Sequence, residues 1–192
     1  MAFVPGHARR GRGRVLPDRT YRRGGWIQRA KSNGQRDRRE VAGVAAAMVT
    51  KDFDELFAAF NARNVRAVVV GGYAFAFHAK PRYTRDIGVF IEPTTENAMR
   101  VLAALDDFGF GGLGLTLADF STPGQTIQLG MPPNRIDLLT VIDGVSFDEA
   151  WAGRVAGRYG GQPVHYIGRV DLIRNKRASG RPQDLADLDA LA

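Results

Sequence analysis

The feature that most constrains the fold is a Val-rich stretch, residues 65–70, that is apolar except for Arg66 and ends at the glycine pair Gly71-Gly72. β-Branched residues favour extended backbone, and paired glycines allow the tight turn that follows a buried strand. Residues 73–79 have the pattern of a short helix, and Pro81 prevents that helix from continuing. The sequence therefore predicts a strand, a glycine turn and a helix in direct succession.

Apolar periodicity extends this pattern along the chain. Residues 53–60 follow helical spacing behind a cap at Thr50 or Asp52, and residues 108–115 resemble a mobile connection. Further strands are predicted at residues 85–91, 126–129, 135–141 and 162–167, and further helices at 95–105, 147–153, 170–178 and 183–191. This order of elements indicates an α/β (α+β) fold, with a mixed sheet flanked by helices and two helices at the C-terminus.

Positive charge is concentrated at the N-terminus. Residues 1–40 carry twelve basic and three acidic side chains, a charge of +9, whereas the remaining residues sum to −2. We interpret residues 1–47 as a disordered, Arg-rich arm and residues 48–192 as one folded domain, because the arm has too few apolar residues to form a core. The arm could neutralise nucleic-acid phosphates, act as a targeting peptide or have no function, and we favour the last interpretation.

Composition excludes several classes of site. The chain has no cysteine and three histidines, which rules out disulfide scaffolds, thiolate chemistry and cysteine-ligated metals and argues against a histidine-rich metal centre. Its apolar runs are all shorter than a membrane-spanning helix requires. We therefore expect a soluble, cytoplasmic protein without membrane contacts.

Two aspartates occupy strands that are otherwise apolar. Asp86 precedes Ile87, and Asp137 lies between Ile136 and Leu138. A buried carboxylate is costly unless it is paired or binds a cation. Each aspartate could pair with a nearby arginine, Arg85 or Arg135, or the two could together hold a divalent cation such as Mg²⁺ (or Mn²⁺).

The order of these motifs resembles a known superfamily. The residues from Val69 to Ala74, with Arg82, Thr84 and Asp86-Ile87 after them, resemble nucleotidyltransferases related to DNA polymerase β. The resemblance is greater to the bacterial AbiEii/MenT-like branch, which includes toxins of toxin–antitoxin systems. The C-terminal pattern that supports this branch contains Leu172-Ile173, Lys176, Gly180-Arg181-Pro182, Asp184-Leu185 and Asp187-Leu188. The resemblance extends from about residue 52 to residue 191.

The resemblance implies a nucleotidyltransferase fold and a specific site. Transfer would proceed from an NTP to a hydroxyl group, with RNA or a tRNA end as the favoured acceptor and an antitoxin protein as a partner. The expected nucleotide-binding residues are Gly71, Gly72, Tyr73, Arg82, Thr84 and Asp184. The expected catalytic residues are Asp86, Asp137 and Lys176. Asp86 and Asp137 would bind the metal, and Asp137 would also help to activate the hydroxyl. Lys176 would reach phosphate oxygens, and Asp184 would orient Lys176 or Arg181.

One position departs from the superfamily pattern. The strand motif of the superfamily is Asp-x-Asp, but Gly88 stands where the second aspartate is expected. Residues 86 and 88 of a strand share a face, so one metal ligand is missing beside Asp86. Two interpretations remain open: a transferase that works with Asp86 and Asp137 alone, and an inactive module that binds a nucleotide or a partner.

Overall fold

The computed structural model describes residues 14–15, 50–81, 83–84, 86–131 and 134–191 of the 192-residue chain. Most of the predicted N-terminal arm lies outside the described residues, and so do Arg82 and Arg85. Within the arm, Arg14–Val15 form a short strand, β1. The prediction of disorder for the rest of the arm stays a prediction.

The described strands form one seven-stranded sheet in the order β1-β4-β5-β3-β2-β7-β6. Three neighbouring pairs are antiparallel (β2/β3, β4/β5, β6/β7) and three are parallel (β1/β4, β3/β5, β2/β7). The strands after β1 are β2 (Ala67–Val70), β3 (Asp86–Ile91), β4 (Thr126–Leu129), β5 (Arg135–Leu139), β6 (Val155–Tyr159) and β7 (Gln162–Tyr166). The mixed sheet predicted from the sequence is confirmed.

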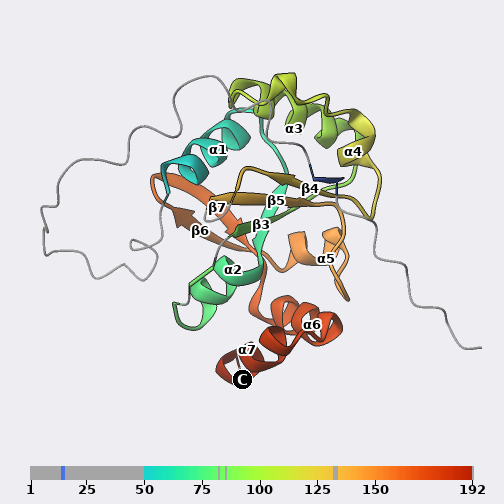
Figure 1. Cartoon of the computed structure of the whole chain (residues 1–192). Helices are drawn as coiled ribbons and strands as arrows, with labels where there is room; N and C mark the ends of the chain where they lie inside the picture. The colour runs from blue at the N-terminus through green and yellow to red at the C-terminus, as the bar shows by residue number, and fades with distance from the viewer. Residues whose placement is uncertain (1–13, 16–49, 82, 85, 132–133, 192) are drawn as a thin grey trace, which may run out of the picture.

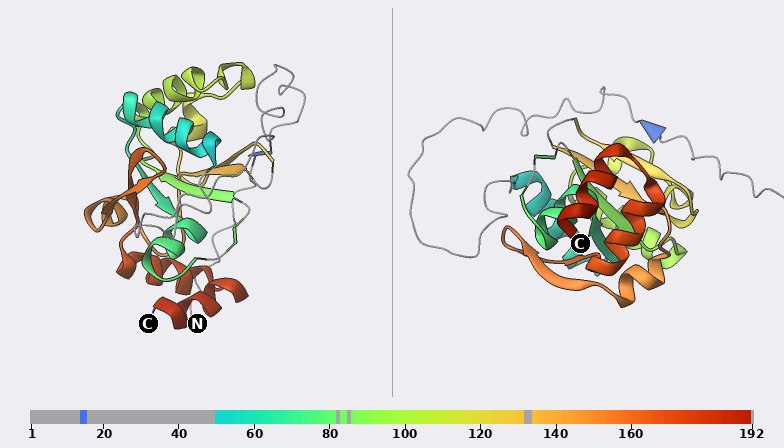
Figure 2. Two further views of the ribbon diagram at one scale, coloured as in Figure 1. Left: turned by 90° about the vertical axis from the view of Figure 1, so that its left-hand side faces the viewer. Right: turned by 90° about the horizontal axis from the view of Figure 1, so that it is seen from below.

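Helices cover the sheet on both sides, with α1, α3 and α4 on one side and α2, α5, α6 and α7 on the other (Figure 1). Turned views show α6 and α7 stacked at one end of the molecule (Figure 2). The helices are α1 (Lys51–Ala62), α2 (Gly71–His78), α3 (Thr95–Asp107), the 3-10 turn η2 (Gly111–Leu113), α4 (Leu117–Ser121), α5 (Phe147–Ala152), α6 (Arg169–Ser179) and α7 (Pro182–Leu191).

Local sequence explains where these helices begin. Thr50 caps α1 by accepting from the N–H of Phe53 at 3.4 Å, and Thr94 caps α3 by accepting from the N–H of Asn97 at 3.2 Å. Ser146 and Glu149 form a reciprocal capping box at α5. Gly180, in a left-handed conformation, ends α6, so the chain can reverse direction into α7.

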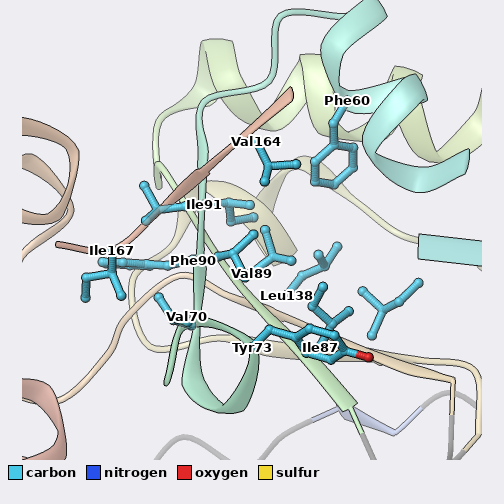
Figure 3. Packing of buried hydrophobic residues seen from close by; sticks show 14 of the residues in the cluster. Phe60, Val70, Tyr73, Ile87, Val89, Phe90, Ile91, Leu138, Val164 and Ile167 are labelled. Carbon is cyan, nitrogen blue, oxygen red and sulfur yellow. The ribbon is translucent and has the colours of Figure 1, made fainter. Parts of the chain in front are cut away.

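The core fills the space between the sheet and its helices. Alternate residues of β3 point to opposite faces, so Val89 faces the same hollow as Phe57 and Phe60 of α1, whereas Phe90 contacts Phe147 of α5 at 5.2 Å between ring centroids. Figure 3 shows the central strands contributing apolar side chains to this core. The sheet is therefore buried on both faces along β3, and its polar residues are exceptions that need partners.

Four of the described elements were not predicted: β1, η2, α4 and β6. Strand β6 buries only Tyr159, and α4 has five residues, of which Phe120 alone is buried. The stretch predicted as a mobile connection contains η2, and Phe108, Phe110 and Leu113 pack against the core.

Candidate active site

The register of the sheet brings the two predicted aspartates onto one face. In the parallel pair β3/β5, Asp86 lies opposite Arg135 and Gly88 lies opposite Asp137. Side chains two residues apart in a strand share a face, and residues opposite one another on adjacent strands point to the same side. Asp86 and Asp137 therefore project from the face of the sheet on which Phe90 contacts α5.

Arg135 joins the two carboxylates. Its Nε donates to Oδ1 of Asp137 at 2.8 Å, and its Nη2 donates to Oδ2 of Asp137 at 3.0 Å. The same Nη2 also donates to Asp86. The arginine pairing considered from the sequence thus holds for both aspartates through a single guanidinium, and this bidentate arrangement is the strong form of such a pair.

The charges at this site perturb one another. Burial raises the pKa of Asp137, the guanidinium of Arg135 opposes that rise, and the negative charge of Asp86 adds to it. Burial lowers the pKa of Arg135, but its bonds and attraction to Asp137 and Asp86 outweigh this and leave the pKa raised. Asp137 is therefore a carboxylate with increased affinity for a proton, held beside a permanently charged arginine.

Two neutral side chains orient the carboxylates. Thr84 Oγ1 lies 3.1 Å from Oδ1 of Asp86 and donates to it, and the nucleotide contact expected of Thr84 stays a prediction. Gln128 of β4 lies opposite Asp137 and forms a side-chain hydrogen bond with it. Sequence reasoning missed Gln128, although a polar residue between Ile127 and Leu129 is the same signal that identified the aspartates.

The glycine turn has two different steric requirements. Gly71 begins α2 with φ +68°, a left-handed conformation that glycine adopts readily, and an added Cβ there would have open space. An added Cβ at Gly72 would lie 2.9 Å from Oγ1 of Thr84. No side chain caps the start of α2, so the backbone N–H groups of this turn are positioned to receive an anion.

Gly88 lies between Asp137 on one side and Val70, which precedes the glycine turn, on the other. In the row across four strands, Gln128, Asp137, Gly88 and Val70 are successive neighbours. The three atoms nearest to an added Cβ at Gly88 all belong to Val70, with Cγ2 at 3.1 Å. An aspartate at residue 88 would therefore emerge beside Asp137, and the Val70 methyl group would have to yield by a few tenths of an ångström.

Tyr73 and Arg82 are two of the predicted nucleotide-binding residues, and only Tyr73 lies within the described part of the chain. The Tyr73 ring, 9% exposed, packs edge-on against Phe53 at 5.9 Å and against Tyr159 at 5.6 Å, which makes it a core residue rather than an open contact. Burial raises the pKa of Tyr73, so its phenol stays neutral. Arg82, the second of these residues, lies outside the described residues.

The structure also corrects the role predicted for Lys176. Its side chain is 2% exposed, and its Nζ donates to Asp184 at 2.9 Å and to Asp187 at 2.7 Å. The ammonium therefore joins α6 to α7 as a buried structural cation, and it cannot reach phosphate oxygens without breaking both pairs. The expected contacts of Asp184 are present, because its other oxygen accepts from Arg181 and from Ser179.

Divalent metal is the cofactor that the sequence implies for this site. The oxygen donors of Asp86 and Asp137 suit a hard cation that completes its coordination with water and substrate phosphates. Among the residues that the structure describes, no group of three or more Asp, Glu, His or Cys side chains could hold a metal. The donor chemistry thus fits one weakly held cation, provided that Arg135 leaves the two carboxylates.

A separate hollow lies on the opposite face of the sheet. It has a volume of about 450 Å³ and is lined by α1, β2, β7 and Trp151. None of the predicted site residues lines it. The carboxylate pair and this hollow are therefore distinct features of the molecule.

Of three comparisons with known proteins, only the one with solved structures found a similar chain. No family model and no curated protein matches the chain. Among solved structures, the fold is similar to the crystal structure of ANT(2")-Ia in complex with adenylyl-2"-tobramycin, with a TM-score of 0.46 and 14% identity. That similarity covers 72% of this chain and 84% of that chain. None of these findings tests the AbiEii/MenT-like branch.

In the described part of the chain, every helix is too short or too polar to cross a membrane.

Proposed function

We propose that this protein transfers a nucleotide from an NTP to a hydroxyl acceptor, with a divalent cation held by Asp86 and Asp137. The observation that supports this most is the convergence of both carboxylates on one face of the sheet, with Thr84 linking them to the glycine turn. Both carboxylates are only partly buried, so a cation or a substrate can reach them from solvent, which favours a chemical role.

The reaction is an in-line substitution at the α-phosphorus. The acceptor oxygen forms a new bond to phosphorus, the bond to the pyrophosphate oxygen breaks, and pyrophosphate leaves. Asp137 accepts the proton of the acceptor hydroxyl as a general base. The N–H groups at Gly71 and Gly72 hold the triphosphate, and Thr84 keeps Asp86 in place. A bound Mg²⁺ or Mn²⁺ supplies charge neutralisation of the phosphates.

The acceptor that we favour is RNA, including a tRNA end. This choice, like the roles of a toxin and an antitoxin partner, rests on the sequence resemblance to the AbiEii/MenT-like branch.

A second candidate function is a catalytically inactive module that binds a nucleotide or a partner. Gly88 favours it, because the site lacks one carboxylate. The burial of Lys176 favours it too, because the cation expected at the phosphates is held between α6 and α7.

Incorporation of each labelled NTP into total RNA and into protein separates the two candidates. We would compare the wild type with Gly88→Asp and Asp86→Ala, with Asp107→Ala as a control, because Asp107 is an exposed carboxylate that pairs with Arg63 away from the site. We expect metal-dependent activity in the wild type, loss in Asp86→Ala and retention in Asp107→Ala. Activity only in Gly88→Asp would identify a transferase silenced by its missing ligand. Inactivity of every variant beside an active relative would favour the binding module.

A further inference from the structure

The guanidinium of Arg135 occupies the position that a cation shared by Asp86 and Asp137 would take. One nitrogen, Nη2, donates to both carboxylates, and Nε completes a bidentate pair with Asp137. The side chain of Arg135 is 28% exposed and those of Asp86 and Asp137 are 36% and 17% exposed, so water screens this interaction only in part.

The fold places Arg135 there by register rather than by the reach of a long side chain. Arg135 and Asp137 share a face of β5, and Arg135 lies directly opposite Asp86 in the parallel pair. The register therefore keeps the base of the Arg135 side chain next to both aspartates. Only a rotation of the side chain, without movement of the backbone, can release them.

Electrostatics makes simultaneous occupation by arginine and metal unfavourable. The two carboxylates and the guanidinium sum to −1, and a divalent cation added between them would lie within a few ångströms of another positive charge. Gly88 removes the third carboxylate that could offset this repulsion. A guanidinium binds phosphate as well as carboxylate through the same paired N–H groups, so an incoming triphosphate offers Arg135 an alternative partner.

We propose that Arg135 competes with a divalent cation for Asp86 and Asp137, and that its guanidinium moves to the triphosphate when a nucleotide enters. The first half of this inference concerns the protein and a metal ion alone. The second half rests on the proposed function. In the empty protein Arg135 stabilises the carboxylates, and in the loaded protein it binds the substrate.

The test measures Mn²⁺ binding to the full chain by electron paramagnetic resonance, without nucleotide. We expect Arg135→Gln to bind Mn²⁺ about 10-fold or more tightly than the wild type, because one neighbouring positive charge is gone. Arg63→Gln is the matched control, since Arg63 makes the same bidentate pair with Asp107 through its Nε and Nη2 atoms. Adding Asp137→Asn to Arg135→Gln should remove the tighter binding. Equal Mn²⁺ affinity in the wild type and Arg135→Gln would overturn the competition.

Nucleotide binding distinguishes this inference from the proposed function. With Mn²⁺ present at saturation, each of the four NTPs is titrated into the wild type, Arg135→Gln and Arg135→Lys. We expect Arg135→Gln to bind NTP more weakly than the wild type, although it binds Mn²⁺ more tightly. Arg135→Lys should have an intermediate NTP affinity, because lysine keeps the positive charge but lacks the paired N–H donors of a guanidinium. Unchanged NTP affinity in Arg135→Gln would overturn the move to phosphate. Failure of every variant to bind any NTP would contradict the proposed function and leave the Mn²⁺ result to decide the competition.

Discussion

At the scale of single residues, the buried ammonium of Lys176 is predicted to contribute strongly to stability. Replacing it by methionine removes the buried ammonium that Asp184 and Asp187 share, while Arg181 remains paired with Asp184. We expect Lys176→Met to lower the free energy of unfolding by about 3–5 kcal/mol, measured by urea denaturation. Arg177→Met, a change at the exposed neighbouring position, should stay within about 0.5 kcal/mol of the wild type. Normal stability together with lost NTP binding in Lys176→Met would restore the phosphate role predicted from the sequence.

The pKa of Asp184 predicts how the stability contributed by the Lys176, Asp184 and Asp187 cluster changes in acid. Burial raises the pKa of Asp184, but its bonds from Lys176, Ser179 and Arg181 outweigh burial and leave it below the ordinary value of 3.8. The contribution of Asp184 to stability is therefore complete above pH 3.8 and is lost as the pH falls through the lower value of the folded state. Unfolding free energies between pH 5 and pH 2.5 should fall more steeply for the wild type than for Asp184→Asn. Parallel curves would exclude this carboxylate as a source of acid sensitivity.

At the scale of elements, we predict that alanine at either glycine of the turn between β2 and α2 destabilises the protein, for a different reason at each position. Gly71→Ala strains a left-handed backbone in open space, at a cost of about 1 kcal/mol. Gly72→Ala instead pushes its Cβ against Thr84. We expect Thr84→Ala to rescue part of the loss in Gly72→Ala and none of the loss in Gly71→Ala. A double-mutant cycle on thermal unfolding measures this coupling, and equal coupling at both glycines would contradict the packing argument.

Most of the helices and strands could be predicted from sequence patterns, and the exceptions have physical reasons. The predicted strands and helices around Gly71-Gly72, Asp86 and Asp137 are confirmed to within a few residues, because apolar periodicity there reflects burial on the sheet. Strand β6 was missed because it is an edge strand with four of its five side chains outside the core. Helix α4 was missed because it is too short for periodicity, although the capping box of Thr116 and Asp119 marks its start.

The two carboxylates of the candidate site could be predicted from the sequence, but the side chains that pair with them could not. Asp86 and Asp137 stand out because charge is costly in an apolar strand. Which arginine meets them depends on strand register, and nothing local determines that β3 and β5 are parallel neighbours with Asp86 opposite Arg135. Lys176 was misassigned for a related reason: its spacing to Asp184 was visible, but its burial follows from the packing of α6 on α7.

At the scale of the whole molecule, charge divides the chain into two parts. Removing residues 1–47 changes the formal net charge from +7 to −2, since all twelve basic and three acidic side chains of residues 1–40 leave together. We expect the truncated chain to unfold within a few degrees of the full chain, because the described contribution of the arm to the sheet is the two-residue strand β1. Thermal unfolding of both chains measures this, and a large loss would show that the arm supports the fold.

Nucleic-acid binding tests the same division. If the arm neutralises phosphates, the full chain binds RNA with an affinity that falls steeply with salt, and the truncated chain does not. If the truncated chain binds as the full chain does, the arm has no such role and the favoured interpretation, an extension without function, is retained. Filter binding at two salt concentrations is sufficient.

The pairing of β2 has a consequence for how the chain folds as it is synthesised. β2 can join β3 soon after both have emerged from the ribosome, but its other edge pairs with β7, where Val69 meets Tyr166. Until β7 has been made, the apolar residues Val68, Val69 and Val70 present an unpaired edge, the kind of surface on which chains associate wrongly. Folding of this protein should therefore be slow, dominated by a distant contact, and most vulnerable to aggregation before β7 has emerged.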